Sequence, residues 1–184
     1  KAEQENKIVM LAIKNAMAMK NFLSLIFLLL IFPSASFSEN YKFQKLVDLK
    51  NPWGSSFINN NELIVTEKSG KIKVVNINSK KVSEFEHNLN FLEHGQGGLL
   101  DILYKDNLIW IAYTENRGNL KTSTSIAKAI LNKKKLKLKN IFQAEPPIES
   151  GYHFGSRLAI KGDYLYASAG ERGKGMIAQD PTKH

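Results

Sequence analysis

Three loops of this 184-residue chain combine glycines with polar side chains that could contact a ligand. They are residues 93–101 (EHGQGGLLD), 150–158 (SGYHFGSRL) and 170–175 (GERGKG). Because glycine has no side chain, the backbone of such loops can approach a ligand closely. None of them has the spacing of a phosphate-binding loop, and no carboxylates are spaced as in a calcium loop. The loops are therefore candidate ligand contacts of another kind.

The elements that would position these loops are short β-strands in a repeat. Segments 57–70, 103–118 and 158–173 share one order: a turn, an apolar strand, and a glutamate followed shortly by glycine. Glu67, Glu115 and Glu171 recur at separations of 48 and 56 residues. A β repeat of 40–50 residues is typical of propeller blades, and no long helical period occurs. We therefore expect an all-β protein, a six-bladed β-propeller of which this chain supplies about the first three blades.

Further strands follow the first two repeat units. Lys71–Asn76 is the expected partner strand after the first unit. Ser123–Leu131 follows the second, and its alanines would allow a helix, but its threonine, its serines and its place in the repeat favour a strand. The run Lys133–Lys139 alternates lysine with leucine at its end, which predicts an exposed strand with a charged outer face.

The first part of the chain resembles an export leader. From Met19 a short basic segment precedes an uninterrupted apolar run, Phe22–Phe32, and then Pro33 and small residues. This order is typical of a secretory signal peptide, and the run is too short for a spanning helix of about 20 apolar residues. We expect residues 1–38 to be leader, with residues 1–18 ahead of the natural start of the signal peptide, and cleavage ahead of Glu39. An uncleaved anchor helix is the alternative.

The composition excludes several classes of protein. The chain contains no cysteine, so disulfide scaffolds and zinc–cysteine sites are excluded. Its 43% hydrophobic residues describe a globular protein. The formal charge is +9, but export would separate the chain from most nucleic acid, so we expect no nucleic-acid partner.

Together with the segments 49–54 and 64–70, the three loops resemble the glucose/sorbosone dehydrogenases. These are soluble aldose sugar dehydrogenases that use pyrroloquinoline quinone (PQQ) on a six-bladed propeller. The motifs occur in order: Gly-Gln-Gly-Gly-Leu-Leu-Asp at 95–101, His-Phe-Gly-Ser-Arg-Leu at 153–158, Gly-Glu-Arg-Gly at 170–173 and Ala-Gln-Asp at 178–180. The resemblance runs from about Leu46 to Asp180, which makes residues 39–184 the expected N-terminal part of the dehydrogenase domain.

The resemblance implies roles for three residues. His153 would be the general base that takes the proton of the sugar C1 hydroxyl while hydride passes to PQQ, and a neutral imidazole can accept that proton. Glu171 would bond this histidine, although the repeat leaves a structural role in capping the blade equally open. Gln96 would contact the cofactor and face the substrate, because an amide both donates and accepts hydrogen bonds. Arg157, Asp101 and Trp53 are expected to be structural.

The resemblance also implies an oxidoreductase with PQQ and Ca²⁺ as cofactors, and the Ca²⁺ ligands and most PQQ ligands would lie beyond His184. No metal ligand is expected in the present chain, which alone should be inactive. The partners would be an aldose and an unidentified electron acceptor, in the periplasm or outside the cell, with no membrane span after leader cleavage. Two alternatives remain: a calcium-dependent propeller lactonase or hydrolase, and a secreted propeller that binds without catalysis.

Overall fold

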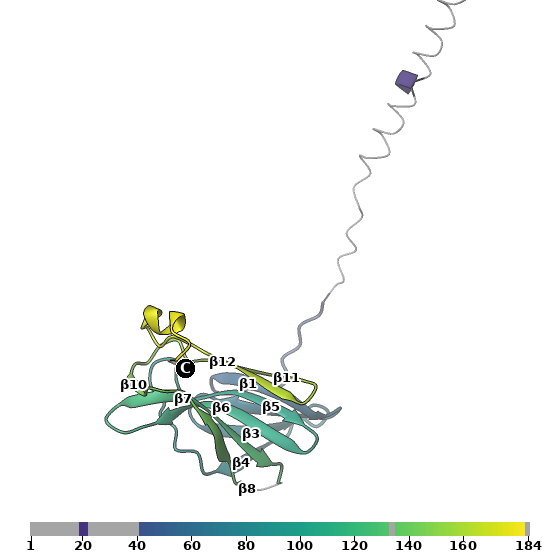
Figure 1. Cartoon of the computed structure of the whole chain (residues 1–184). Coiled ribbons are helices and arrows are strands. Elements are labelled where there is room, and N and C mark those ends of the chain that lie inside the picture. The colour runs from purple at the N-terminus through teal and green to yellow at the C-terminus, as the bar shows by residue number, and fades with distance from the viewer. Residues whose placement is uncertain (1–18, 22–40, 133–134, 183–184) are drawn as a thin grey trace, which may run out of the picture. The chain divides into compact units, whose positions relative to one another are not determined.

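The computed structural model describes residues 19–21, 41–132 and 135–182. The chain divides into Lys1–Phe43 and Gln44–His184, and the second unit contains all the strands of the described residues (Figure 1). Apart from Met19–Asn21, which are helical, the predicted leader lies outside the described residues. No helix in the part of the chain that the structure covers is long and apolar enough to cross a membrane.

Four of the five strands of the first sheet form an antiparallel meander. They are β1 (Pro52–Asn59), β2 (Glu62–Glu67), β3 (Lys71–Asn76) and β4 (Val82–His87). Each strand pairs with the next one along the chain, as short loops permit only for antiparallel neighbours. The strand predicted over Lys71–Asn76 is confirmed, with the same bounds.

The second sheet repeats this plan. It contains β5 (Leu99–Lys105), β6 (Leu108–Asn116), β7 (Lys121–Ile130), β9 (Lys139–Gln143) and β10 (Ile148–Glu149). β5 and β6 are joined by Asp106 and Asn107, both with positive φ, as a tight hairpin turn requires. β7 pairs with β6 along one edge and with β9 and β10 along the other. The choice of strand over helix for the alanine-containing segment is thus confirmed.

The third sheet contains two strands within the described residues, β11 (Gly155–Lys161) and β12 (Tyr164–Ala169), followed by the short 3₁₀ helix η1 (Gly175–Gln179). The first strands of the three sheets are neighbours, because β5 contacts both β1 and β11. Sheets that meet through their first strands radiate from a common line. This is the arrangement that a propeller predicts.

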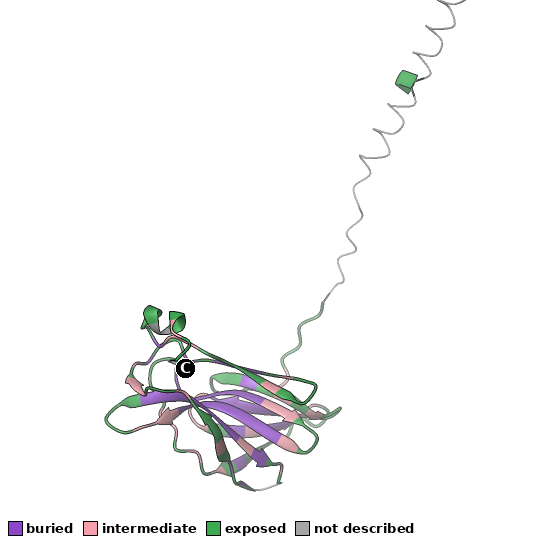
Figure 2. Cartoon of the chain, in the orientation of Figure 1, coloured by how far each residue is buried: buried purple, intermediate pink, exposed green. Residues whose placement is uncertain are grey.

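Two apolar cores join the sheets, and the middle sheet contributes to both. Along β6 the side chains of Ile109, Ile111 and Tyr113 pack with the first sheet. Those of Trp110 and Ala112 alternate with them and pack with Phe154 and Leu158 of the third-sheet region. Since successive residues of a strand point to opposite faces, β6 is buried on both sides (Figure 2).

The lysine-rich run is not a single strand. Leu136 and Leu138 are buried between exposed lysines, which agrees with the predicted alternation. However, β8 (Lys135–Leu136) pairs parallel with β4 of the first sheet, whereas Lys139 begins β9 of the second sheet. The prediction of one strand is wrong because this segment crosses from one sheet to the next.

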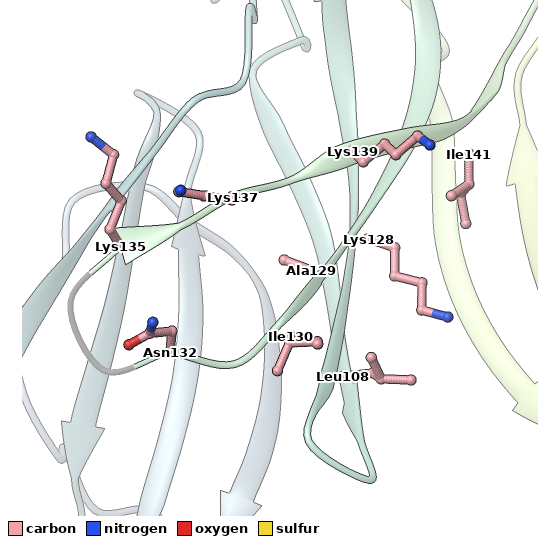
Figure 3. Close-up of a pocket in the computed structure, with 9 residues that line it drawn as sticks. All are labelled: Leu108, Lys128, Ala129, Ile130, Asn132, Lys135, Lys137, Lys139 and Ile141. Carbon is pink, nitrogen blue, oxygen red and sulfur yellow. The ribbon is translucent and has the colours of Figure 1, made fainter.

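This crossing segment borders a groove of about 600 Å³. Figure 3 shows its lining, which comes from β6, β7, β8, β9 and the residues between them: Leu108, Lys128, Ala129, Ile130, Asn132, Lys135, Lys137, Lys139 and Ile141. The groove contains none of the residues to which the sequence assigned chemistry. The candidate site residues lie instead in the three glycine-rich loops.

Candidate active site

His153 contacts both of the other residues predicted to act in the site, Gln96 and Glu171. Gln96 lies in the loop before β5, His153 between β10 and β11, and Glu171 directly after β12. The backbone N–H of His153 donates to Oε1 of Gln96 over 2.9 Å. On its other side, Nδ1 of His153 bonds Oε1 of Glu171. Residues separated from His153 by 57 and 18 positions in the sequence thus meet at this histidine.

Glycines allow this close approach of the loops. A Cβ atom on Gly95 would lie 2.3 Å from the carbonyl oxygen of Gly151, and one on Gly170 would lie 1.9 Å from that of His153. Both distances are far below van der Waals contact, so any side chain would push the loops apart. Because Gly95 and Gly151 have no side chains, the backbone N–H of Gln96 can donate to the Gly151 carbonyl over 2.7 Å. The glycines of the motifs therefore bring the Gln96 loop and the Glu171 loop against the His153 loop.

His153 presents one ring nitrogen to the outside. Its backbone has a φ of 49°, and its side chain is 55% exposed. A carboxylate can only accept a hydrogen bond, so Nδ1 donates to Glu171 and Nε2 retains its lone pair when the ring is neutral. Nε2 makes no hydrogen bond or ion pair with the described residues. An accessible imidazole nitrogen of this kind can accept a proton from a bound hydroxyl group.

Glu171 is held in place by its own loop as well as by the histidine. Its Oε2 accepts hydrogen bonds from the backbone N–H groups of Gly173 and Lys174. The hydrogen bond with His153 is the main cause that lowers the pKa of Glu171, and it outweighs the opposing effect of desolvation. The carboxylate is therefore ionised at neutral pH. It can fix the imidazole tautomer and stabilise the imidazolium that forms after proton uptake.

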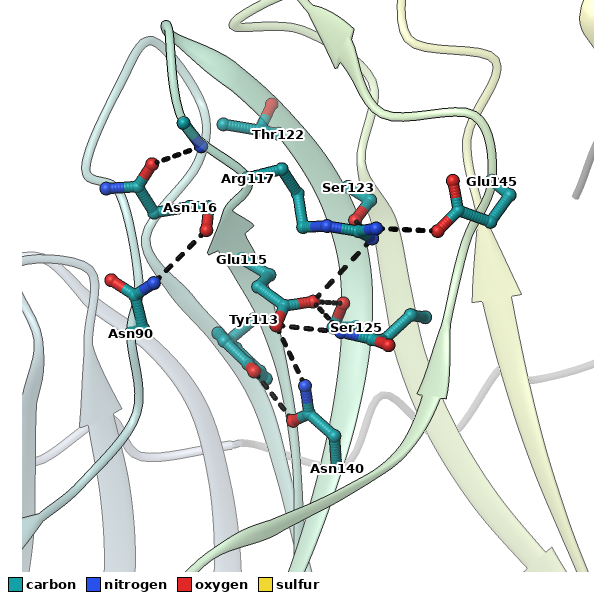
Figure 4. Close-up of polar contacts among 12 residues, drawn as sticks. Asn90, Tyr113, Glu115, Asn116, Arg117, Thr122, Ser123, Ser125, Asn140 and Glu145 are labelled. Carbon is teal, nitrogen blue, oxygen red and sulfur yellow. Dashed lines mark hydrogen bonds and ion pairs between the residues drawn. The ribbon is translucent and has the colours of Figure 1, made fainter.

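The equivalent glutamates of the other two repeat units, Glu67 and Glu115, bond no histidine of the described residues and instead bond neighbouring strands. Glu67 is buried, and its Oε1 accepts hydrogen bonds from the Lys50 backbone at 2.6 Å and from Nζ of Lys73 at 2.8 Å. Glu115 accepts hydrogen bonds from side chains of β7 and β9 and lies at the limit of an ion pair with Arg117 (Figure 4). Both join strands within their own sheets. Glu171 combines capping of its loop with a direct contact to His153.

The other residues of the motifs support the strands. Asp101 is buried, and its Oδ2 accepts the backbone N–H of Leu158 over 2.8 Å, which joins β5 to β11. Arg157 approaches Asp101 at 3.4 Å, although 77% of its side chain is exposed. Trp53 on β1 is 43% exposed and lies outside both cores.

Sequence reasoning missed two cations that hold the site loops. Nζ of Lys68 donates to the carbonyl of Gly95, next to Gln96. Arg172 is buried and donates to the carbonyls of Ser150 and Tyr152, next to His153. The only available signal was position, since Arg172 belongs to the Gly-Glu-Arg-Gly motif and Lys68 follows the first repeated glutamate.

The site residues differ in how well they suit the two implied cofactors. Gln96 uses its Oε1 on His153, while its Nε2 makes no hydrogen bond with the described residues and is free to donate to a quinone or sugar oxygen. These residues suit one side of a PQQ site. For Ca²⁺, the described residues contain no group of three histidine, aspartate or glutamate side chains that could hold a metal ion. We therefore assign no residue of this chain to Ca²⁺.

Comparison with known proteins gives the family. The model of the glucose/sorbosone dehydrogenase family matches residues 49–184. Aldose sugar dehydrogenase YliI of Escherichia coli is 28% identical over 145 residues, which cover 73% of this chain and 39% of that protein. The chain therefore belongs to the glucose/sorbosone dehydrogenase family.

Solved structures agree with this assignment. A crystal structure of a glucose dehydrogenase superposes with a TM-score of 0.71 at 27% identity and covers 76% of this chain and 44% of its own. The PQQ-bound form of an aldose sugar dehydrogenase from Streptomyces coelicolor superposes with a TM-score of 0.65, covering 74% and 42% of the two chains. At 23% identity, the similarity to this second structure supports a common fold and nothing more. The predicted propeller fold is confirmed, and the chain spans less than half the length of these relatives.

Proposed function

We propose that the complete protein carrying these residues is an aldose dehydrogenase that uses PQQ and oxidises the C1 hydroxyl of an aldose to the lactone. The observation that carries the proposal is the arrangement around His153: Glu171 binds Nδ1, Nε2 has no hydrogen-bond partner among the described residues, and Gln96 accepts the backbone N–H of His153. Family membership supports the reaction type. PQQ is supported by the bound cofactor of the Streptomyces coelicolor enzyme, which shares the fold.

In this reaction His153 receives the proton. The C1 hydroxyl of the sugar donates its hydrogen to Nε2, and the proton stays on the imidazole as the O–H bond breaks. When bound, PQQ would supply the hydride acceptor, so that loss of the C1 hydrogen with its electron pair would leave the C1=O bond of the lactone. Glu171 stabilises the imidazolium through Nδ1, and its lowered pKa keeps it ionised for this purpose.

Gln96 would position the reactants. Its Oε1 is occupied by the backbone of His153, so the amide plane is fixed relative to the base. Because the amide group is planar, the position of Nε2 is fixed as well, and Nε2 can donate to an oxygen of the cofactor or of the sugar. An amide does this without adding charge beside the base.

Further properties of the complete protein belong to the same proposal. Export through the predicted leader would bring the enzyme to the periplasm, where mass spectrometry of the mature protein should find an N-terminus at Glu39. The Ca²⁺ ligands and most of the PQQ ligands are expected among residues beyond His184. The particular aldose and the electron acceptor are for substrate and acceptor panels to identify.

The test is dye-linked oxidation of a panel of aldoses by the complete protein with PQQ and Ca²⁺ added. Activity should require PQQ, and His153→Ala should reduce kcat by about 10²-fold or more, the usual scale for loss of a general base. His87→Ala is the matched control, because His87 bonds the carbonyl of Gly70 in the first sheet and is no part of the site. A folded protein that oxidises no aldose would refute the proposal and return the lactonase and the non-catalytic binding protein as candidates.

A further inference from the structure

Arg172 is an arginine buried beside the proposed base. Only 7% of its surface is exposed, and it forms no ion pair with a carboxylate of the described residues. Burial lowers its pKa to about 10, which still leaves the guanidinium charged at neutral pH. A buried charge without an opposite charge is costly unless polar groups surround it. The hydrogen-bond acceptors around the guanidinium are therefore what stabilises its charge.

Oxygen atoms of two segments surround this guanidinium. Nε donates to the carbonyl of Tyr152 over 3.1 Å, and Nη2 donates to that of Ser150 over 2.7 Å. Nη1 and Nη2 also donate to the carbonyl and the hydroxyl of Thr122 in β7, over 3.0 and 2.5 Å. Four hydrogen bonds from a planar, rigid donor thus join the residues just before His153 to a central strand of the second sheet.

The same residue touches His153 and the residue after it. The guanidinium carbon lies 3.7 Å from the centre of the Phe154 ring, a cation–π contact. The backbone N–H of Arg172 donates to the carbonyl of His153 over 3.3 Å. Arg172 therefore contacts the base loop before, at and after the base itself, whereas Glu171 contacts the imidazole ring.

The second repeat unit contains a matched arginine with other contacts. Arg117 lies two residues after Glu115 and just past the end of β6, and Arg172 directly follows Glu171 after β12. It binds Ser123 and forms an ion pair with Glu145 at 2.7 Å. Its side chain has carboxylate partners and touches no part of the base loop. The contacts of Arg172 are thus specific to the blade that carries the site.

We propose that Arg172 is a positioning residue that holds the loop of residues 150–154 against β7 and so fixes the place of His153. The proposal rests on the proposed function, because it assigns Arg172 a role in presenting that base. A guanidinium suits this task better than an ammonium group, since its fork of donors reaches several carbonyls in one fixed plane. Loss of the fork should let the base move without removing it.

The first measurement does not depend on activity. Hydrogen–deuterium exchange of the complete protein is compared for wild type, Arg172→Met, Arg172→Lys and the matched control Arg117→Met. In Arg172→Met the amides of residues 151–154 should exchange at least about tenfold faster, since they lose the bonds that hold them. In Arg117→Met they should exchange as in wild type. Unchanged exchange in folded Arg172→Met would overturn the proposal.

The second measurement is steady-state oxidation of the preferred aldose. A misplacement of the base of about 1 Å costs about 10²-fold, so kcat of Arg172→Met should fall by about 10²-fold while KM changes little. Arg172→Lys should recover part of this loss. Full recovery by lysine would mean that charge alone matters, and wild-type kcat in Arg172→Met would mean that packing alone matters. Either result contradicts a positioning role for the fork.

Two provisions keep the outcomes distinct. If Arg172→Met does not fold, Thr122→Val removes one acceptor with little change of shape, and it should lower kcat by about threefold to tenfold. Unchanged kcat and exchange in that variant would overturn the proposal. If wild-type protein oxidises no aldose, the proposed function has failed, and the exchange experiment alone decides whether Arg172 holds the loop.

Discussion

Replacement of Gly170 by alanine should displace the proposed base without touching its side chain. The added Cβ would lie 1.9 Å from the carbonyl oxygen and 2.6 Å from the carbonyl carbon of His153. Gly170 does not have a positive φ, so alanine can adopt its backbone conformation and the effect is steric. To reach an ordinary contact of 3.4 Å the carbonyl must retreat by about 1.5 Å.

A shift of that size is large for a general base. Proton transfer requires the base to lie within hydrogen-bond reach of the hydroxyl group, and misplacement by about 1 Å costs about 10²-fold in rate. We therefore expect kcat of Gly170→Ala to fall by about 10²-fold. Overpacking should also lower the free energy of unfolding by about 1–3 kcal/mol.

The assay is dye-linked oxidation of the preferred aldose by the complete protein, with urea unfolding in parallel. Gly175→Ala is the matched control, because no atom lies within 4 Å of its Cβ position and its φ is not positive. It should keep wild-type kcat. Folded Gly170→Ala with kcat within about threefold of wild type would refute the reasoning, since the base would then tolerate the displacement.

The remaining predictions concern the three repeated glutamates. Glu171→Gln should lower kcat by about 10²-fold or more, because the imidazolium loses its carboxylate partner. Glu115→Gln should leave kcat unchanged and lower the free energy of unfolding by about 1–3 kcal/mol in urea titrations; the reverse pattern would contradict the roles assigned here. For Glu67, burial alone would raise the pKa, but the hydrogen bond from Lys73, the Lys50 backbone and nearby charge lower it below 4.5. Its stabilisation is therefore present above pH 4.5 and lost as the pH falls through the folded value, so Glu67→Gln should weaken the acid dependence of unfolding. Equal slopes of stability against pH below 4.5 in both proteins would contradict this.

The repeat explains why much of the fold could be predicted. Apolar runs separated by short turns require antiparallel neighbours, and the recurring glutamates aligned the strands β2, β6 and β12 at equivalent places. The strand predicted over Ser123–Leu131 followed from its place in the repeat despite its alanines, and the structure has it as Lys121–Ile130. In contrast, the sequence did not show that the run from Lys133 to Lys139 passes from one sheet to the next. Alternation reports which side chains are buried, and it does not report which strand is the partner.

The candidate site could be predicted in part for the same reason. Motif order pointed to Gln96, His153 and Glu171, and these three side chains lie together in the folded chain. The support from Lys68 and Arg172 was not visible, because a cation in a loop is expected in solvent. Only packing between loops shows that Arg172 is buried against Thr122 and the base loop.

The amino-acid sequence by itself determined the strands, their turns and the loops that carry the polar residues. These depend on local pattern, since alternation and glycine act over a few residues of chain. Local pattern leaves the three repeated glutamates equivalent, and only the family resemblance singled out Glu171 as the partner of His153. The enclosure of Arg172 was decided by the tertiary structure alone. Glu115 accepts a hydrogen bond from Asn140 of β9 in its own sheet. Glu171 instead bonds His153, because the loop before β11 passes over the end of β12. That difference arises from contacts between segments distant in the sequence, which no local pattern encodes.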